Sequence, residues 1–358
     1  MTHVSIAAME FLFQYGLFLA EALTVVIAFL VVLVLGIGLT RRAGAHEGIE
    51  VTHLNRRYEQ MTATLEQAML SKQAAKAHAK TKKAQDKAQS KADSKARKRA
   101  AKSGESGEDP RPRLFVLDFH GDLRASGASA LREEITAVLG VATVKDEVLV
   151  RVDNAGGMVH GHGLAASQLV RLREKNIPLT ISVDKVAASG GYMMACVADR
   201  IVAAPFAIVG SIGVLAQIPN FHRLLDRAGV DFELVKAGEH KRTLTLFGEN
   251  TPEDREKMQQ DVENVHALFK RYVARYRPSL DIEQVATGEH WHGVDAIELG
   301  LVDELQTSDD YLMASAQERD LYAIKYAEKQ GLSDRLASVV SLTLGRCMER
   351  LSEWSYQR

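Results

Sequence analysis

Ser189 is the residue in this sequence that is best placed to act as a nucleophile. It lies in the segment Ala187–Gly191, with alanines before it and glycines after it, where a strand pattern ends and a helix would begin. Small neighbours leave room for a carbonyl group to approach the hydroxyl, and the free N–H groups at a helix start suit an oxyanion. The alternative is that Ser189 only caps the helix, as serines often do.

A serine hydroxyl is a weak nucleophile unless a neighbouring base accepts its proton. The segment Val235–Thr243 offers two candidate bases side by side, His240 and Lys241. A lysine can serve only where burial lowers its pKa far enough to leave a neutral amine, whereas a histidine would form a Ser–His pair. The residues alone leave both alternatives open.

Gly156 and Gly157 form a second backbone feature of interest, because they follow a predicted strand, Val148–Val152. Glycines let the backbone turn sharply and bring an N–H group against a ligand without a Cβ in the way. The same pair is compatible with an ordinary turn between a strand and a helix. By itself the pair does not decide between the two.

Histidines occur in two His-x-His pairs, a spacing compatible with metal binding: His160/His162 and His290/His292. Neither pair has a convincing third ligand, and His290 flanks Trp291 in what reads as a surface turn. The two cysteines lack metal-ligand spacing and are too few for a disulfide framework. We therefore expect neither a metal site nor a cofactor.

Strand and helix patterns alternate beyond residue 113, which predicts βαβ units, an α/β fold and a mostly parallel sheet. The expected strands are Leu114–Phe119, Val148–Val152, Leu179–Val183, Arg200–Ala203 and Phe232–Val235. The expected helices are Ser129–Leu139, Gly163–Lys175 and Thr251–Tyr276. We assign residues 113–330 to one catalytic domain.

Residues 1–40 read as a membrane anchor. Ala22–Leu39 is 18 residues long and carries no charge, and about 20 apolar residues are needed to cross a bilayer as a helix. A cleaved signal peptide is the alternative, but no Lys or Arg precedes the apolar run, which is longer than an ordinary signal-peptide core. One transmembrane helix is therefore expected ahead of the α/β domain.

Residues 41–112 read as a basic tether and linker. Lys72–Lys102 holds 12 Lys and Arg residues against two Asp. This run either binds anionic lipid headgroups or extends as a solvated, partly helical tether, which is the interpretation we favour. It lacks the interleaved aromatic residues of a nucleic-acid-binding segment, so no nucleic-acid partner is expected.

Residues 331–358 carry an apolar stripe between Leu332 and Trp354 that predicts an amphipathic helix. Such a helix could pack on its own domain, join subunits or rest on the membrane. The stripe alone does not choose among these three surfaces, although packing on its own domain or on a sister subunit is the interpretation we favour.

Three motifs stand in a distinctive order: Val183–Val214 (VDKVAASGGYMMACVADRIVAAPFAIVGSIGV), Gly238-Glu-His-Lys241 and Gly293–Asp303. Together they resemble the signal peptide peptidase A family of serine peptidases, in particular its SohB branch, and the last segment resembles the wider ClpP/crotonase superfamily. The match runs from about Arg113 to about Leu305. The resemblance implies a ClpP/crotonase-like fold with flanking helices.

The same resemblance implies roles for single residues. Ser189 would be the nucleophile, and Lys241, which lies 52 residues further on, would be the base. Ser211, in a Gly-Ser-Ile-Gly-Val segment, would orient the lysine.

The resemblance also implies an oxyanion hole made by the N–H groups of Gly157 and Gly190. One departure concerns the glycine turn. The family usually has Ser-Pro before the two glycines, whereas this chain has Asn154-Ala155. Because proline fixes the backbone angle φ, we expect a less restrained turn here.

By resemblance, the chain is a membrane-anchored serine endopeptidase that acts on hydrophobic peptides, such as signal-peptide remnants, or on damaged membrane proteins. It would lie in the bacterial inner membrane with a single span. Basic residues after the anchor place the domain in the cytoplasm, whereas the family suggests the periplasm, and the sequence leaves the side open.

A homo-oligomer is expected, since relatives in the superfamily build peptide-binding surfaces from identical subunits. Two other functions stay as alternatives. A crotonase-like acyl-CoA enzyme would have no use for a Ser189/Lys241 pair or an anchor, and a catalytically silent membrane scaffold would not need Ser189, Lys241 and Ser211 intact.

Overall fold

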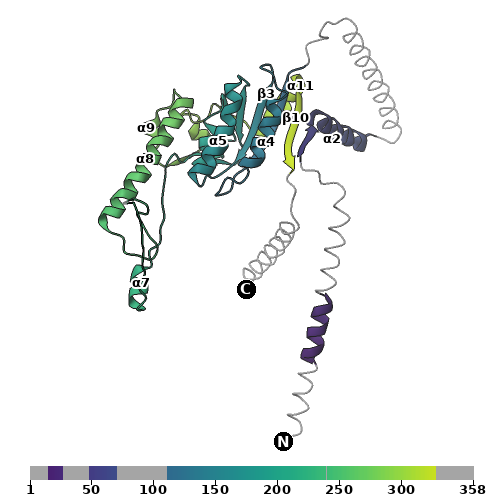
Figure 1. Ribbon diagram of the computed structural model, residues 1–358. Helices are drawn as coiled ribbons and strands as arrows, with labels where there is room; N and C mark the ends of the chain where they lie inside the picture. The colour runs from purple at the N-terminus through teal and green to yellow at the C-terminus, as the bar shows by residue number, and fades with distance from the viewer. Residues whose placement is uncertain (1–14, 27–47, 71–110, 239, 328–358) are drawn as a thin grey trace. The chain divides into compact units, whose positions relative to one another are not determined.

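The computed structural model describes residues 15–26, 48–70, 111–238 and 240–327 (Figure 1). The chain divides into two units, Ile49–Tyr326 and a unit made of the two terminal stretches. In the terminal unit, residues 15–26 are helical. None of the described helices is both long enough and apolar enough to span a membrane. Most of the predicted anchor, the basic run and the C-terminal stripe lie outside the described residues.

The larger unit is built on a seven-stranded sheet with the strand order β1-β10-β2-β3-β4-β6-β9. From β10 to β9 every described pairing is parallel, as the alternating pattern predicts. The strands are β1 (Gly48–His53), β10 (Asp320–Ala327), β2 (Arg113–His120), β3 (Glu147–Asp153), β4 (Leu179–Val183), β6 (Arg200–Ala203) and β9 (Glu304–Leu305).

A second, three-stranded sheet has the order β5-β7-β8. Strand β5 (Val186–Ala188) runs parallel to β7 (Ile208–Gly210), and β8 (His290–His292) runs antiparallel to β7. The turn that we predicted at His290 is therefore wrong, because this segment completes a sheet edge. The sequence just after β5 and β7 contains Ser189 and Ser211.

Strand β2 shows that the main sheet is buried on both faces. Phe115, Leu117 and Phe119 join a large hydrophobic core, whereas the alternate residues Leu114 and Val116 join a smaller one. The large core contains residues of α4 (Ala128–Leu139), α5 (Val159–Glu174) and α6 (Gly190–Ala195), and the smaller core contains residues of α2 (Leu54–Met69) and α11 (Ser308–Glu318). Parallel sheets normally have helices on both faces.

Helix α8 (Pro252–Tyr276) begins where the sequence predicts it. The Thr251 hydroxyl and the Asp254 carboxylate form a reciprocal capping box, and Pro252 occupies the first turn, an arrangement that favours a helix start. Phe269 and Val273 pack into the large core. The shorter helices α9 (Ile282–Val285) and α10 (Gly293–Ala296) follow before β9.

Between β7 and α8 the chain forms an exposed arm, residues 214–250, which contains the short helix α7 (His222–Arg227). Its two ends are joined by the Phe221 N–H, which donates to the Leu246 carbonyl at 2.7 Å, and Phe221 and Phe232 both contact the Phe247 ring. The predicted strand Phe232–Val235 is wrong. Its residues are exposed and pair with no strand that the structure describes.

Candidate active site

Ser189 lies in a strained backbone conformation between β5 and α6. Its angles are φ 51° and ψ −115°, a region that costs a non-glycine residue about 1–3 kcal/mol and is frequent at functional sites. Its N–H donates to the Gly210 carbonyl at 2.8 Å, which holds the residue in place. Ser189 is the N-cap residue of α6, but its hydroxyl makes no capping hydrogen bond, so the hydroxyl itself does not stabilise the helix start.

Ser211 follows β7 as Ser189 follows β5. In the parallel pairing Ala188 lies opposite Gly210, and Ser189 and Ser211 are the residues that follow them. Neighbouring strands lie about 4.8 Å apart in a sheet, so the two serines lie side by side. Ser211 also has a φ of 51°. Its N–H donates to the Glu289 carbonyl at 2.6 Å, which ties it to the segment before β8.

The glycine turn, which contains Gly156 and Gly157, packs directly against Ser189. A Cβ added to Gly156, whose φ is 92°, would lie 2.7 Å from the Ser189 Cβ and 2.9 Å from the Gly190 nitrogen. A Cβ on Gly157 would lie 2.3 Å from the Leu123 carbonyl oxygen. Both positions therefore require glycine.

The N–H groups of Gly157 in the turn and of Gly190 at the start of α6 have no acceptor among the described residues. Free donors beside a nucleophile can stabilise the oxyanion of a tetrahedral intermediate. The structure thus brings together the four site residues Ser189, Ser211, Gly157 and Gly190.

Asn154 holds the turn from its first residue. Its backbone bonds to β5 on both sides, with its N–H donating to Val186 at 2.8 Å and its carbonyl accepting from Ala188 at 3.0 Å. Its Oδ1 accepts the Gly156 N–H at 2.9 Å. The turn that we expected to be loose without proline is restrained by this side chain.

His162, on α5, lies 3.2 Å through Nε2 from the same Asn154 oxygen. Sequence reasoning missed both residues as parts of the site. It considered His162 only as half of a possible metal-binding pair, and no spacing in the sequence signals its contact with Asn154. Both ring nitrogens are instead engaged by protein oxygens.

Lys241 lies on the arm and is exposed, and so is His240. The Lys241 N–H donates to the Gly238 carbonyl at 3.2 Å, which closes a turn. In the part of the chain that the structure describes, neither the Ser189 hydroxyl nor the Lys241 amine has a hydrogen-bond partner. The single chain therefore does not join the two predicted members of the dyad, and it does not provide the burial that a neutral amine needs.

Other nucleophiles near Ser189 are blocked by burial. Cys196 directly follows α6 and is 0% exposed. Burial raises the pKa of its thiol, so the thiol stays protonated and unreactive. The Tyr192 hydroxyl is likewise buried and donates to the Leu301 carbonyl at 2.9 Å. Both groups contribute packing beneath the site.

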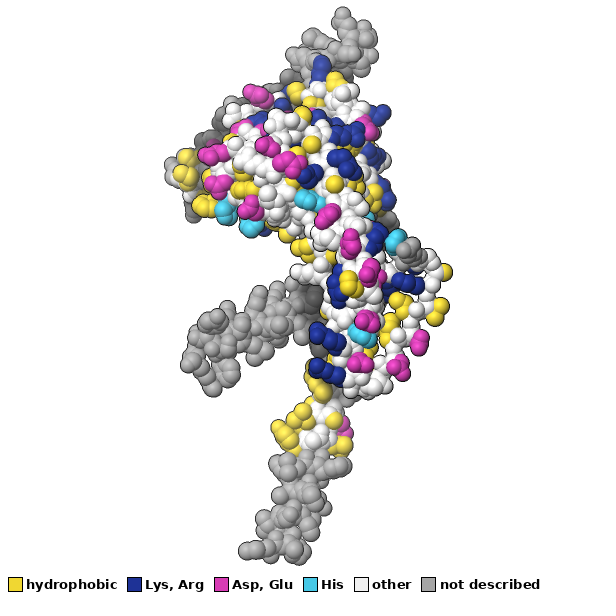
Figure 2. All heavy atoms as spheres, turned by 90° about the vertical axis from the view of Figure 1, so that its left-hand side faces the viewer, with side chains coloured by type: hydrophobic (Ala, Val, Ile, Leu, Met, Phe, Trp, Pro, Cys, Tyr) yellow, Lys and Arg dark blue, Asp and Glu magenta, His cyan; other side chains and the backbone are white. Residues whose placement is uncertain are grey.

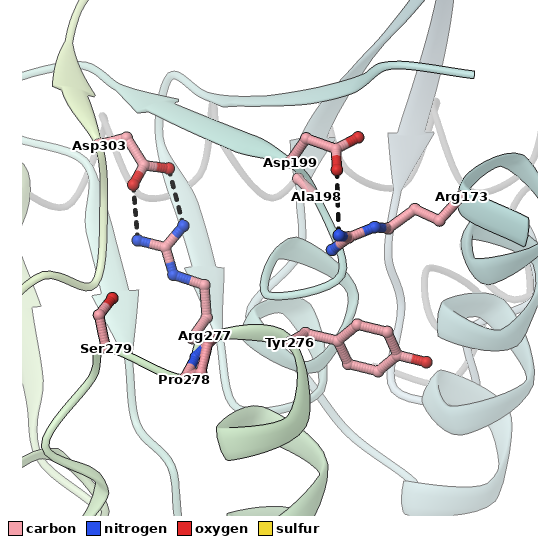
Figure 3. A pocket seen from close by; sticks show the side chains of 8 residues that line it. All are labelled: Arg173, Ala198, Asp199, Tyr276, Arg277, Pro278, Ser279 and Asp303. Carbon is pink, nitrogen blue, oxygen red and sulfur yellow. Dashed lines mark hydrogen bonds and ion pairs between the residues drawn. The ribbon is translucent and has the colours of Figure 1, made fainter. Parts of the chain in front are cut away.

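A pocket of about 170 Å³ lies elsewhere, beside the C-terminal end of α8 (Figure 3). Arg277 binds Asp303 through two hydrogen bonds of 2.7 and 2.8 Å, and Arg173 pairs with Asp199 at 3.1 Å. The two positive charges are thus matched by two negative charges within the pocket. This arrangement fastens α5 and α8 to the sheet and does not favour a charged ligand.

Comparison with known proteins places the chain among peptidases. The family model described as Peptidase family S49 N-terminal matches residues 10–169, and the one described as Peptidase family S49 matches residues 171–322. "Probable protease SohB" of Haemophilus influenzae is 49% identical over 325 residues, covering 90% of this chain and 91% of that protein. A protein of the same name from Buchnera aphidicola is 53% identical over 241 residues, covering 67% of this chain and 72% of that protein.

The chain also resembles a solved protease structure, at low sequence identity. A 1510-N membrane-bound stomatin-specific protease, solved with a substrate peptide, has a TM-score of 0.41 and 13% identity, covering 64% of this chain and 98% of that chain. This similarity is too low to transfer a role to any residue.

Proposed function

The chain belongs to peptidase family S49, and we propose that it is a membrane-anchored serine endopeptidase with a Ser189/Lys241 dyad. The observation that carries this proposal is the backbone around Ser189. A strained serine with an uncommitted hydroxyl lies beside the free N–H groups of Gly157 and Gly190. These parts are what acyl transfer from a peptide carbonyl needs.

In the proposed mechanism, the Ser189 Oγ attacks the peptide carbonyl while the neutral amine of Lys241 accepts the hydroxyl proton. The carbonyl oxygen becomes an oxyanion, which accepts hydrogen bonds from Gly157 and Gly190. Each such donor contributes about 3 kcal/mol to transition-state stabilisation. Lys241 then returns the proton to the leaving amine, and a water molecule releases the acyl group from Ser189 by the same steps.

Ser211 is proposed to orient the amine of Lys241 toward Ser189. Its place at the next position on the neighbouring strand supports this role. The hydroxyl makes only a long contact of 3.4 Å to the Gly288 carbonyl, so it can turn toward an arriving amine at little cost.

Packing of the arm is proposed to bring Lys241 to the site. The arm exposes apolar side chains that a monomer would leave in water, including Leu215 at 78% and Val235 at 96%. Figure 2 views the side that carries α7 and α8, where hydrophobic side chains lie among charged ones. A homo-oligomer would cover this surface and desolvate Lys241, which favours the neutral amine.

Hydrophobic peptides are the proposed substrates, for instance signal-peptide remnants or segments of damaged membrane proteins. Leu123, Met158 and Val159 support this, since they flank the glycine turn and are 66%, 40% and 40% exposed. Burial of such side chains against an apolar peptide is favourable by about 25 cal/mol per Å².

Residues 22–39 are proposed to anchor the enzyme in the bacterial inner membrane, with the bilayer as its second partner. The apolar composition of this segment supports the proposal. A reporter fused after Arg113 would assign the membrane side of the peptidase domain, which the charge rule and the family resemblance place differently.

Labelling with a fluorophosphonate probe tests the proposed function. The full-length protein in detergent should be labelled at Ser189, and Ser189→Ala should remove the label, because only an activated serine reacts. An acyl-CoA enzyme or a silent scaffold would not be labelled. A label on another residue, or none in an oligomeric preparation that hydrolyses peptides, would contradict the assignment of Ser189.

A further inference from the structure

We propose that His162 and Asn154 form a buried clamp that positions the oxyanion donors of Gly157 and Gly190. This inference rests on the proposed function and assigns two further residues to it. His162 is 0% exposed and Asn154 is 1% exposed. Neither can touch a substrate, so both are positioning residues.

The amide orientation of Asn154 follows from its neighbours. The Gly156 N–H points at the Asn154 side chain at 2.9 Å, so the atom that faces it must be the oxygen. The amide nitrogen then faces the sulfur of Met194 at 3.6 Å. With this orientation, the 3.2 Å contact from His162 Nε2 also ends on an acceptor oxygen.

The His162 ring spans the glycine turn from one end to the other. Nε2 faces the side-chain oxygen of Asn154, which precedes the turn, and Nδ1 lies 2.9 Å from the carbonyl oxygen of Met158, which follows it. A neutral ring donates from one nitrogen only. Met158 is the N-cap of α5 itself, so the Nε2 contact is the one that links the helix to Asn154 at the far end of the turn. The Asn154 side-chain oxygen that faces Nε2 is also the acceptor of the Gly156 N–H.

The same two residues also pack beneath the second donor. A Cβ added to Gly190 would lie 2.4 Å from the His162 ring, and one added to Gly191 would lie 2.1 Å from the Asn154 carbonyl oxygen. The start of α6 therefore rests on the ring and on the Asn154 backbone. Movement of His162 would displace both oxyanion donors relative to Ser189.

Oxyanion donors act mainly in the transition state, so loss of their positioning should lower kcat and leave KM nearly unchanged. For His162→Phe we expect kcat to fall about 10- to 100-fold, less than the about 10²- to 10³-fold loss that follows removal of a whole donor. Asn154→Ala should have a similar effect. Because the two act as one unit, the double variant should be little worse than either single variant.

Two conservative variants separate positioning from simple packing. His162→Gln can keep a donor near the Nε2 position, facing Asn154, and should recover most of the lost kcat. His162→Asn can keep a donor near the Nδ1 position, facing Met158, and should resemble His162→Phe. Ser167→Ala, on the exposed side of the same helix, is the matched control and should be unaffected.

The experiment measures kcat and KM for a hydrophobic peptide with the full-length protein in detergent, with active sites counted by the fluorophosphonate label. Equal kcat per labelled site in His162→Phe and wild type would overturn the clamp, as would a His162→Gln variant no better than His162→Phe. A lower melting temperature with unchanged kcat per labelled site would show packing only and would also overturn it. Failure of Ser189 labelling in the wild type would instead overturn the proposed function itself, and this inference with it.

Discussion

The proposed nucleophile and its proposed base lie in two regions of very different construction. Ser189 stands where a small sheet, the glycine turn and a buried helix meet, and backbone hydrogen bonds fix it on several sides. Lys241 stands on an arm whose residues are mostly exposed and whose contacts are largely internal.

The difference indicates that the two halves of the site are made in different ways. The proposed oxyanion donors lie on backbone that the fold of one chain holds in place, and electrostatic catalysis requires such preorganised donors. Lys241, the proposed base, is exposed on the arm, so in our proposal its surroundings depend on what the arm packs against. Activity should therefore respond differently to changes in the core and in the arm.

The largest expected effect comes from removing either residue of the proposed dyad. Ser189→Ala should lower kcat by about 10⁴-fold or more, the scale expected when a serine nucleophile is lost. The melting temperature should not fall, since the Ser189 hydroxyl makes no hydrogen bond within the described residues. Lys241→Ala should be equally inactive. Peptide hydrolysis and thermal unfolding measure both quantities.

Lys241→Arg is the matched control for the base. Arginine keeps the positive charge but cannot lose its proton at any accessible pH. An inactive Lys241→Arg variant is expected if the lysine accepts the proton. Activity close to wild type would mean that Lys241 supplies only charge and that another group is the base.

The core was more predictable from the sequence than the arm. The strands β2, β3, β4 and β6 and the helices α4 and α8 were predicted to within one or two residues. Periodicity reports burial, and the four strands and α4 are largely buried, whereas α8 is marked by its capping residues. The segment Phe232–Val235 has the same apolar character but no strand beside it. The apolar pattern alone does not distinguish a buried strand from an exposed apolar surface.

Within the site, the sequence indicated residues whose types are chemically distinctive. Ser189, Ser211 and the glycines stand in motifs, so the resemblance could assign them. Asn154 and His162 have no such signal, since their contact depends on how β3 passes into α5. The sequence did not show the restraint that the Asn154 side chain adds, since its hydrogen bond holds the turn where proline would fix φ.

The next prediction, of intermediate size, concerns the arm. Val235→Asp should weaken the proposed self-association and lower kcat/KM by about tenfold or more, equivalent to about 1.4 kcal/mol, because it places a charge on the apolar surface that we propose forms the contact. Met313→Asp is the matched control. Met313 is 65% exposed and lies on α11, away from the arm in the sequence. Light scattering coupled to gel filtration measures the assembly, and peptide hydrolysis measures the activity.

A monomer that is fully active at micromolar concentration would contradict the proposed role of assembly. Mixing experiments sharpen the test. If the arm of one copy serves the core of another, an equal mixture of Ser189→Ala and Lys241→Ala chains should regain activity at about a quarter of its sites after subunit exchange. No recovery would mean that each arm serves its own core.

The smallest expected effect concerns the free energy of unfolding. It compares a carboxylate in the core, Asp146, with one just after the arm, Asp254 in the first turn of α8. Asp146 precedes β3 and is 3% exposed. Burial alone would raise its pKa, but hydrogen bonds from Arg113 and Thr143 outweigh burial and lower the pKa to about 2. The unfolded chain takes up this proton near pH 4, so the stabilisation is complete above that pH and is lost as the pH falls toward 2.

Asp146→Asn should therefore lower the free energy of unfolding at neutral pH by about 1 kcal/mol, after allowance for solvent screening, and should flatten the decline of stability between pH 4 and pH 2. Asp254→Asn is the control at the border of the arm. Hydrogen bonds from Thr251 lower the pKa of Asp254 as well, but Asp254 is only partly buried, whereas Asp146 is buried. Asp254→Asn should therefore change the decline of stability between pH 4 and pH 2 less than Asp146→Asn does. Urea unfolding at a series of pH values measures the free energy of unfolding of both variants. An equal decline between pH 4 and pH 2 in the two variants would show that Asp254 contributes as much to folding as Asp146.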